Sequence, residues 1–218
     1  MPSRDFYPSE FTARSRAVLD EVRAIVPGAV LIGGWGTWAR TRGPMSHDVD
    51  LILSRGELDV LSQQVEDLSA TSHFGGRTWR ARRKDVHLDL YVPYESTLGQ
   101  RLELRVEALM SRQEEVEGWR VLDLPAHTCT KFAALLDRPD SDPGEKDRHE
   151  IVGLLGLGVD ASEAAAVLHE ASKRTPEELP ALVDRAFGYL QDLDLDRRGR
   201  AGLREAAARW QQGLVGPR

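Results

Sequence analysis

The most informative stretch of this sequence is the run Leu31-Ile32-Gly33-Gly34, followed after thirteen residues by Asp48-Val49-Asp50-Leu51-Ile52-Leu53. The apolar residues 29–32 predict a buried strand that ends in a tight turn at the paired glycines. A short helix is expected over residues 35–42, and the β-branched, partly alternating segment 48–53 predicts a second strand. The pattern therefore predicts a strand, a turn into a helix, and a strand that carries two carboxylates.

Two carboxylates stand two residues apart in this second strand. Side chains at this spacing leave the same face, so Asp48 and Asp50 are expected side by side. Because like charges repel, both remain ionised only with a cation nearby, and Mg²⁺ or Mn²⁺ suits oxygen ligands. Taken alone, such a pair is more often a solvated strand end. Whether it forms a metal site therefore depends on the neighbouring segments.

A third carboxylate, Asp89, lies in the middle of the alternating segment 86–92. A carboxylate in mid-strand is unfavourable by propensity and usually has a reason. If this strand lies beside 48–53, three carboxylates converge, and three can hold two metal ions about 3.5–4 Å apart. Gly33 and Gly34 add backbone N–H groups that can approach a phosphate at the start of a helix.

The remaining pattern predicts a chain in two halves. We expect a helix over 9–25 capped by Ser9, a helix over 56–70, and a hairpin of strands 77–83 and 86–92. One more strand is expected over 119–124, and from 125 onward the chain is expected to be helical, with breaks at 140–144, 158, 176 and 199. The predicted organisation is an α+β core over 1–118 and a helical domain over 119–218.

The glycine turn, its spacer, the Asp-x-Asp strand and the later Asp89 together resemble the DNA polymerase β-like nucleotidyltransferase superfamily. The resemblance implies an α+β fold with a small mixed sheet flanked by helices, followed by a helical half. It implies an enzyme that transfers a nucleoside monophosphate from an NTP to an acceptor and releases pyrophosphate, with two Mg²⁺ or Mn²⁺ ions. Asp48, Asp50 and Asp89 would hold the metal ions, Asp89 would also help to deprotonate the acceptor hydroxyl, and Gly33, Gly34 and Ser46 would seat the phosphates.

A second region, 131–138 followed by Lys146-Asp147, looks like the lysine-to-Lys-Asp signature of AbiEii-type nucleotidyltransferase toxins. The resemblance covers about residues 29–157 and implies that Lys131 neutralises the triphosphate while Asp147 completes the site. Lys131 and Arg138 are seven apart and share a helix face, so both could clamp phosphate charge. The alternative is that Lys131 is a surface lysine. Glu150 stands where an aspartate is more usual and receives no catalytic role.

Three classes of function remain open on this pattern. The AbiEii-type resemblance implies the toxin of a toxin–antitoxin pair, which modifies tRNA and has a cognate antitoxin as partner. Small-molecule adenylyltransferases that inactivate antibiotics share the first signature, and the net charge of −6 would suit cationic aminoglycosides. A catalytically idle binding module is disfavoured by three intact acids together with Lys131.

Five basic residues fall within eight positions of an otherwise acidic chain. They are Arg77, Arg80, Arg82, Arg83 and Lys84, here called the basic segment. A run of this kind is usually a solvated strand face. Its functional interpretation is contact with the phosphates of an RNA acceptor, with the 3′ end of tRNA expected, because the segment leads into the strand that carries Asp89.

The composition indicates the cellular compartment in which the protein is expected. Cys129 is the only cysteine, which excludes an internal disulfide and a thiolate zinc cluster. No uncharged apolar run approaches the roughly 18–20 residues that span a bilayer, and residues 1–5 lead into no apolar stretch of the kind found in signal peptides. We therefore expect a cytoplasmic protein that has no membrane partner.

Overall fold

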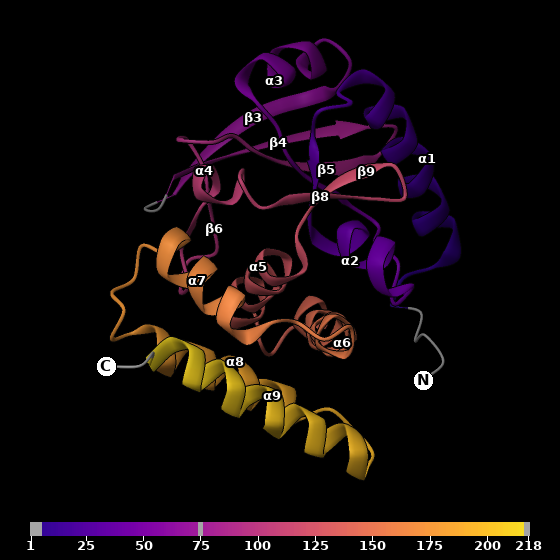
Figure 1. Ribbon diagram of the computed structural model, residues 1–218. Helices are drawn as coiled ribbons and strands as arrows, with labels where there is room; N and C mark the ends of the chain where they lie inside the picture. Colours follow the sequence, from indigo (N-terminus) through magenta and orange to yellow (C-terminus); the bar gives the residue numbers. More distant parts are fainter. Residues whose placement is uncertain (1–5, 74–75, 216–218) are drawn as a thin grey trace. The chain divides into compact units, whose positions relative to one another are not determined.

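The computed structural model describes residues 6–73 and 76–215, and its chain divides into two compact units. The first unit comprises residues 1–97 and 105–123, and the second comprises 98–104 and 124–218. Figure 1 labels most of the helices and strands of both units. The fold is a mixed α+β fold with a mixed sheet flanked by helices, as the sequence predicted.

The first unit is built on a seven-stranded sheet in the order β3-β4-β5-β2-β1-β9-β8 among the described residues. Strand β1 pairs antiparallel with β2 and parallel with β9, while β2 pairs parallel with β5. The outer pairs β3–β4, β4–β5 and β8–β9 are antiparallel. The strands are β1 (Val30–Leu31), β2 (Val49–Ile52), β3 (Glu66–His73), β4 (Gly76–Arg83), β5 (Val86–Tyr91), β8 (Gln113–Val116) and β9 (Trp119–Leu122).

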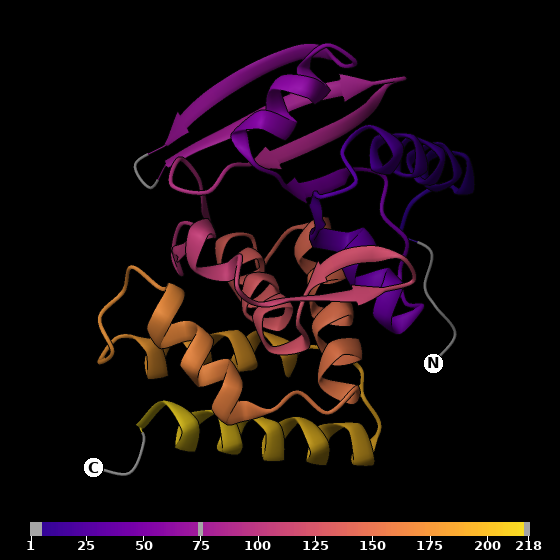
Figure 2. The same ribbon diagram turned by 45° about the horizontal axis from the view of Figure 1, so that its top comes forward.

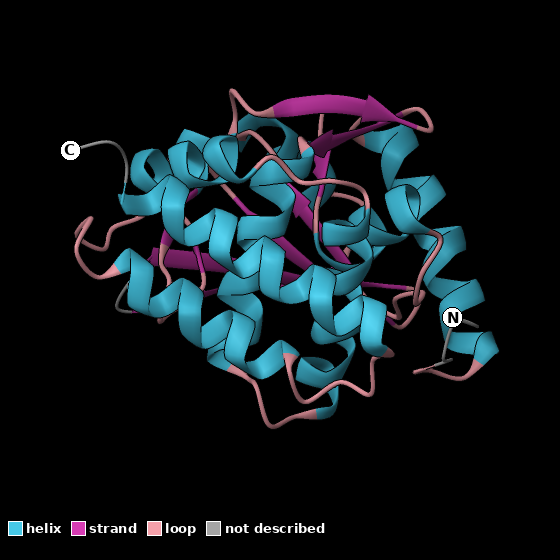
Figure 3. Cartoon of the chain, turned by 60° about the horizontal axis from the view of Figure 1, so that its bottom comes forward, coloured by secondary structure: helices cyan, strands magenta, loops and turns pink. Residues whose placement is uncertain are grey.

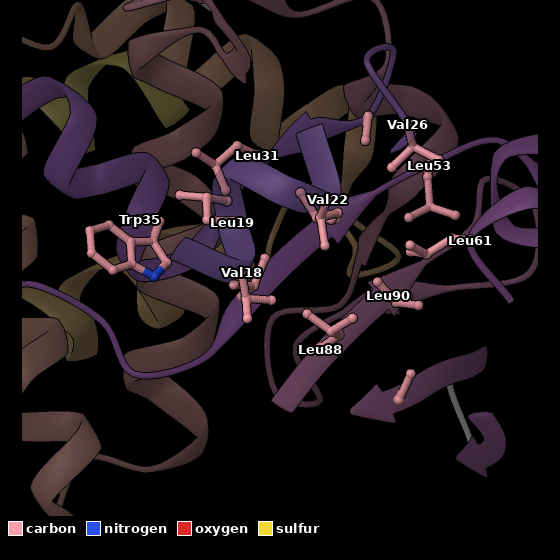
Figure 4. Close-up of a cluster of buried hydrophobic side chains, with 14 of the residues drawn as sticks. Val18, Leu19, Val22, Val26, Leu31, Trp35, Leu53, Leu61, Leu88 and Leu90 are labelled. Atoms are coloured by element: carbon pink, nitrogen blue, oxygen red, sulfur yellow. The ribbon is translucent and has the colours of Figure 1, made fainter. Parts of the chain in front are cut away.

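Helices of the first unit are α1 (Ser9–Ile25), α2 (Gly33–Thr41), α3 (Arg55–Ser62) and the short α4 (Val106–Leu109). Helix α1 buries Val18, Leu19 and Val22 in one cluster with apolar side chains of β2 and β5. Figure 4 shows these α1 side chains beside Leu53, Leu88 and Leu90. Alternation in β5 supplies this contact, because every second residue of the strand is buried. The cluster fixes the strands whose opposite face carries Asp50 and Asp89.

The predicted hairpin is confirmed. Strands β4 and β5 are antiparallel and are joined by only two residues, Lys84 and Asp85. Both have positive φ, 50° and 65°, as the two-residue turns that match the twist of a hairpin require. Figure 2 shows β3, β4 and β5 as neighbouring purple strands. This pairing places Arg80 opposite Asp89.

Two local predictions in the first unit are wrong. The predicted helix 56–70 stops at Ser62, and residues 66–73 form strand β3 instead. This edge strand has few β-branched residues, so pairing with β4 and not propensity makes it a strand. Ser9 does not cap α1: Pro8 occupies the cap position, makes no side-chain cap bond, and leaves Ser9 as the first helical residue.

Most described residues of the second unit lie in helices, and helices are drawn in cyan in Figure 3. Phe132, Phe187 and Trp210 meet in its core, with ring centroids 4.8 to 5.9 Å apart. None of the described helices is both long enough and apolar enough to cross a membrane. The helices are α5 (Leu124–Asp137), α6 (Asp142–Gly156), α7 (Ala161–Ala171), α8 (Leu179–Leu190) and α9 (Arg197–Val215). The short strands β6 (Thr97–Leu98) and β7 (Leu104–Arg105) form a separate two-stranded sheet.

The break predicted at Gly199 is wrong, because Gly199 lies in the first turn of α9. Its N–H donates to the Asp196 carboxylate at 2.7 Å, so Asp196 caps the helix and the break lies before it. The observed units also differ from the predicted division at 118/119. Strand β9 belongs to the sheet of the first unit because it pairs with β1, and residues 98–104 belong to the second unit.

Candidate active site

Three of the predicted site residues of the first unit, Gly33, Asp50 and Asp89, are brought together by the sheet. Asp50 and Asp89 are direct register partners on the parallel strands β2 and β5, so their side chains leave the same face one strand spacing apart. Gly33 begins α2 with φ +61°, and a Cβ at this position would lie 2.0 Å from Asp50 Oδ2. The backbone of the glycine turn therefore lies directly against the Asp50 carboxylate, in a space that no side chain can share. Gly34 follows as a buried residue of α2.

Asp48 lies just before β2, not within it. A buried network holds its backbone: Trp35 Nε1 donates to Ser15 Oγ at 2.8 Å, and Ser15 Oγ donates to the Asp48 carbonyl at 3.3 Å. Its side chain is oriented by Ser46, whose hydroxyl donates to Asp48 Oδ1 at 2.5 Å. The buried Ser46 thus contacts a carboxylate in this structure, a role that the sequence did not predict for it.

The donor chemistry of this face fits a hard divalent ion. Mg²⁺ is commonly held by one or two carboxylates together with substrate phosphates, and Asp50 and Asp89 supply such a pair. Within residues 6–73 and 76–215, no group of three or more His, Cys, Asp and Glu side chains lies close enough to hold a metal ion. The two-ion site built from Asp48, Asp50 and Asp89 stays a prediction.

The basic segment is ion-paired along its whole length. Arg80 Nε lies 3.0 Å from Asp89 Oδ1, which couples the segment to a candidate catalytic carboxylate. Arg82 pairs with Asp67 at 3.0 Å, and both Arg83 and Lys84 pair with Glu21 of α1. Arg77 lies 3.8 Å from Glu95 and also stacks over Trp79. Much of the positive charge visible in the sequence is therefore balanced by carboxylates from distant segments.

A second cluster, in the helical unit, contains the other predicted site residues. Lys131 Nζ lies 3.2 Å from Asp147 Oδ1 and 2.5 Å from Glu150 Oε2. Lys146 Nζ lies 3.2 Å from Glu150 Oε1, and Arg138 Nε lies 2.8 Å from Asp147 Oδ2. These five side chains, here called the buried ion cluster, alternate in sign from Lys146 to Arg138 and carry three positive and two negative charges.

Burial in this cluster is nearly complete except at Arg138. The Lys131 side chain is 5% exposed and Glu150 is fully buried, whereas Arg138 is 48% exposed. The alternative that Lys131 is a surface lysine is therefore wrong. Arg138 is the member that an anion from solvent reaches first.

Glu150 is the residue whose importance the sequence did not reveal. Burial by itself would raise the pKa of this carboxyl, but the charges of Lys131 and Lys146 and their hydrogen bonds outweigh it and hold the pKa below its ordinary value. The carboxylate is thus ionised at neutral pH and holds both lysine side chains in place. The signal available in the sequence was its position four residues after Lys146, a spacing that brings opposite charges together on one helix face.

Lys131, Arg138 and Asp147 belong to the second unit, whereas the carboxylates of β2 and β5 belong to the first. That Lys131 and Asp147 complete the site of these carboxylates stays a prediction. Cys129 is a core residue: it is buried, and its thiol donates to the Ala164 carbonyl at 3.6 Å.

We expect Gly33→Ala to damage both stability and activity. The left-handed backbone costs a side chain about 1–2 kcal/mol, and the added Cβ must displace the Asp50 carboxylate. A lower midpoint in urea and at least a roughly tenfold loss of turnover should result. Gly56→Ala in α3 is the matched control, since nothing lies within 4 Å of its Cβ. Equal behaviour of the two variants would show that the turn does not position Asp50.

No protein-family model matches this sequence, and no curated protein matches it either. Among solved structures, the chain is similar to JHP933 from Helicobacter pylori, with 14% identity over 96% of this chain and 95% of that one and a TM-score of 0.48. It is also similar to an antigenic nucleotidyltransferase-like protein from Paracoccidioides brasiliensis, with 15% identity over 89% of this chain and 92% of that one and a TM-score of 0.45. The roles proposed below rest on this chain's own residues.

Proposed function

We propose that this protein is a metal-dependent nucleotidyltransferase. The observation that carries the proposal is the meeting of Gly33, Asp50 and Asp89 on one face of the sheet, with a glycine backbone against one carboxylate and a second carboxylate in register beside it. Paired carboxylates below a glycine turn at a helix N-terminus suit a divalent ion and a polyphosphate together.

Each residue then has a defined role in the reaction. The acceptor hydroxyl attacks the α-phosphorus of the NTP, the bond to the β-phosphate breaks, and pyrophosphate leaves. Asp89 accepts the hydroxyl proton, and Asp48 and Asp50 orient the reacting groups with Ser46 holding the Asp48 carboxylate. The backbone at Gly33 and Gly34 binds the phosphates. Bound Mg²⁺ or Mn²⁺ would supply charge neutralisation of the phosphates.

The acceptor we propose is RNA, with the 3′ end of tRNA as the first candidate, in a toxin that has a cognate antitoxin. Arg80 supports this choice because it connects the basic segment to Asp89, so that an acceptor phosphate bound by Arg80 would lie beside the chemistry. A small cationic acceptor such as an aminoglycoside would be repelled by the same arginine.

A transfer assay tests the proposal. The protein is incubated with each of four α-labelled NTPs and Mg²⁺, in parallel with total tRNA and with a panel of aminoglycosides. Label on tRNA that disappears in EDTA is the expected result. Label on an aminoglycoside would instead assign the small-molecule activity, and label on neither acceptor with any NTP would contradict the proposal.

We expect neutralisation of Arg77, Arg80 and Arg82 to glutamine to lower RNA modification and flatten its dependence on salt. Fewer phosphate contacts release fewer counterions, so the slope of log activity against log salt should fall by about one per lost contact. The affinity for NTP should change little. The matched control neutralises Arg197, Arg198 and Arg200, exposed residues at the start of α9, and so removes the same charge elsewhere. An identical effect of both triple variants would assign the loss to net charge alone.

A further inference from the structure

Residues 98–104 of the second unit, here called the platform, form a segment whose backbone is held in place. The carboxylate of Asp137, at the end of α5, accepts the backbone N–H groups of Gln100 and Arg101, both at 2.8 Å. Gly99 has φ +80°, and a Cβ there would lie 2.5 Å from the Leu102 carbonyl, so only glycine suits this turn. The loop backbone is therefore fixed at the point where the Arg101 side chain departs.

The Arg174 side chain forms hydrogen bonds with this platform. Its Nε donates to the Arg101 carbonyl at 2.9 Å, and its Nη2 donates to the Gln100 carbonyl at 2.8 Å. Nη2 also lies 3.1 Å from Glu103 Oε1. These contacts use one edge of the guanidinium, hold it in a single orientation and leave Nη1 outside the contacts just described.

An open hollow of about 460 Å³ lies between this platform and helix α8. Its lining, here called the arginine hollow, comprises Arg101, Arg174, Glu178, Ala181, Leu182 and Arg185. Within the part of the chain that the structure describes, the guanidinium groups of Arg101 and Arg185 form no ion pair or hydrogen bond. Three guanidinium groups thus surround one space that has a single carboxylate in its lining.

The shape and charge of the arginine hollow indicate which kind of ligand it can bind. Three like charges around one space repel, and an anion that accepts hydrogen bonds from several directions would relieve that repulsion. A phosphate group does so, because its oxygens are arranged tetrahedrally and match guanidinium forks, whereas a carboxylate offers only two coplanar oxygens. The volume exceeds that of one phosphate and falls in the range of small-molecule sites. Ala181 and Leu182 offer apolar surface to the sugar or base that carries the phosphate.

We propose that the arginine hollow binds the phosphate group of a nucleotide, either free or as part of an RNA chain. This inference does not rest on the proposed function, because the hollow uses none of the residues assigned to transfer. An anion site of this kind on an otherwise acidic chain would hold a nucleotide or RNA independently of the glycine turn.

Titration calorimetry of the whole protein in EDTA tests the proposal. The probes are ADP, for a free nucleotide, and a single-stranded RNA hexamer, for a nucleotide within RNA. EDTA suppresses metal-dependent binding elsewhere. Arg101→Gln with Arg185→Gln should weaken binding at least tenfold and leave the melting temperature unchanged, since neither side chain has a partner to lose. Arg198→Gln with Arg204→Gln removes the same charge from exposed positions of α9 and should change the affinity less than twofold.

The outcomes separate the sources and decide the claim. Loss of both ADP and RNA binding in the Arg101/Arg185 variant shows that the site binds a nucleotide phosphate in general. Loss of RNA binding alone shows that the site binds RNA and not free nucleotides. Equal weakening in both double variants would overturn the proposal, as would the absence of binding of either probe to the unmodified protein at millimolar concentration. A hexaglutamate peptide that binds the hollow more tightly than both probes would also overturn it, in favour of an acidic protein partner. None of these results bears on the transfer assay.

Discussion

Asp50→Asn is expected to abolish nucleotidyl transfer while the protein remains folded. Asp50 is the carboxylate against which the glycine turn lies, and its amide analogue has the same shape without the charge that would hold a divalent ion. Loss of a single electrostatic group from an active site costs about 10²–10³-fold in turnover, and we expect at least that here. Asp48→Asn should act in the same direction because its carboxylate is held by Ser46.

The stability of these variants distinguishes a catalytic role from a structural one. Removal of one of two neighbouring negative charges relieves repulsion between Asp50 and Asp89, so the free energy of unfolding should stay within about 1 kcal/mol of wild type or rise. Asp59→Asn, an exposed position of α3, is the matched control and should leave turnover unchanged. Undiminished turnover in Asp50→Asn, or in wild type treated with EDTA, would falsify the catalytic assignment.

Glu150→Gln is expected to produce the largest loss of stability among the substitutions considered. The fully buried carboxylate is the partner of both Lys131 and Lys146, and the amide would remove the negative charge that these two buried ammonium groups share. Removal of one partner from a buried ion pair typically costs about 3–5 kcal/mol. Urea unfolding measures the effect. Glu205→Gln on the exposed face of α9 is the control and should cost under about 0.5 kcal/mol.

Two further measurements make this prediction specific. Lys146→Met should cost less in the Glu150→Gln background than in wild type, because the lysine has then already lost its ion pair with Glu150. The lowered pKa of Glu150 also means that its contribution to stability is fully present above its ordinary pKa of 4.5 and is lost as the pH falls through the lower folded value. Wild type should therefore lose more stability on acidification than Glu150→Gln does. Parallel acid curves, or a Glu150→Gln variant as stable as Glu205→Gln, would contradict a role for the cluster in folding.

Local patterns predicted the elements around the candidate site. The apolar run before Gly33 and Gly34 and the alternation over 86–92 are properties of short windows, and the structure has a strand, a turn into α2 and the β4–β5 hairpin there. The same approach failed at residues 66–73 because an edge strand with few β-branched residues has no strong local signature. Its conformation comes from the partner strand.

The residues of the candidate site could be predicted from local sequence, but their contacts could not. Residue type and spacing were enough to select Gly33, Asp50 and Asp89 as candidates, because the alternation of a strand sets which side chains share a face. The register pairing of Asp50 with Asp89 and the contact of the Gly33 backbone with the Asp50 carboxylate became visible in the folded chain. The parallel pairing of β2 with β5 joins segments that no short window contains together.

Burial and charge pairing were decided entirely by the tertiary structure. The sequence showed a basic segment and a helix lysine, but Glu21, Asp67 and Glu95, which balance the basic segment, come from other parts of the chain. Glu150 was an unassigned residue of a predicted helix until the packing of α5 against α6 enclosed it with Lys131. A sequence window carries residue type and periodicity, whereas the dielectric environment and counterion of a charge depend on the distant segment that packs against it.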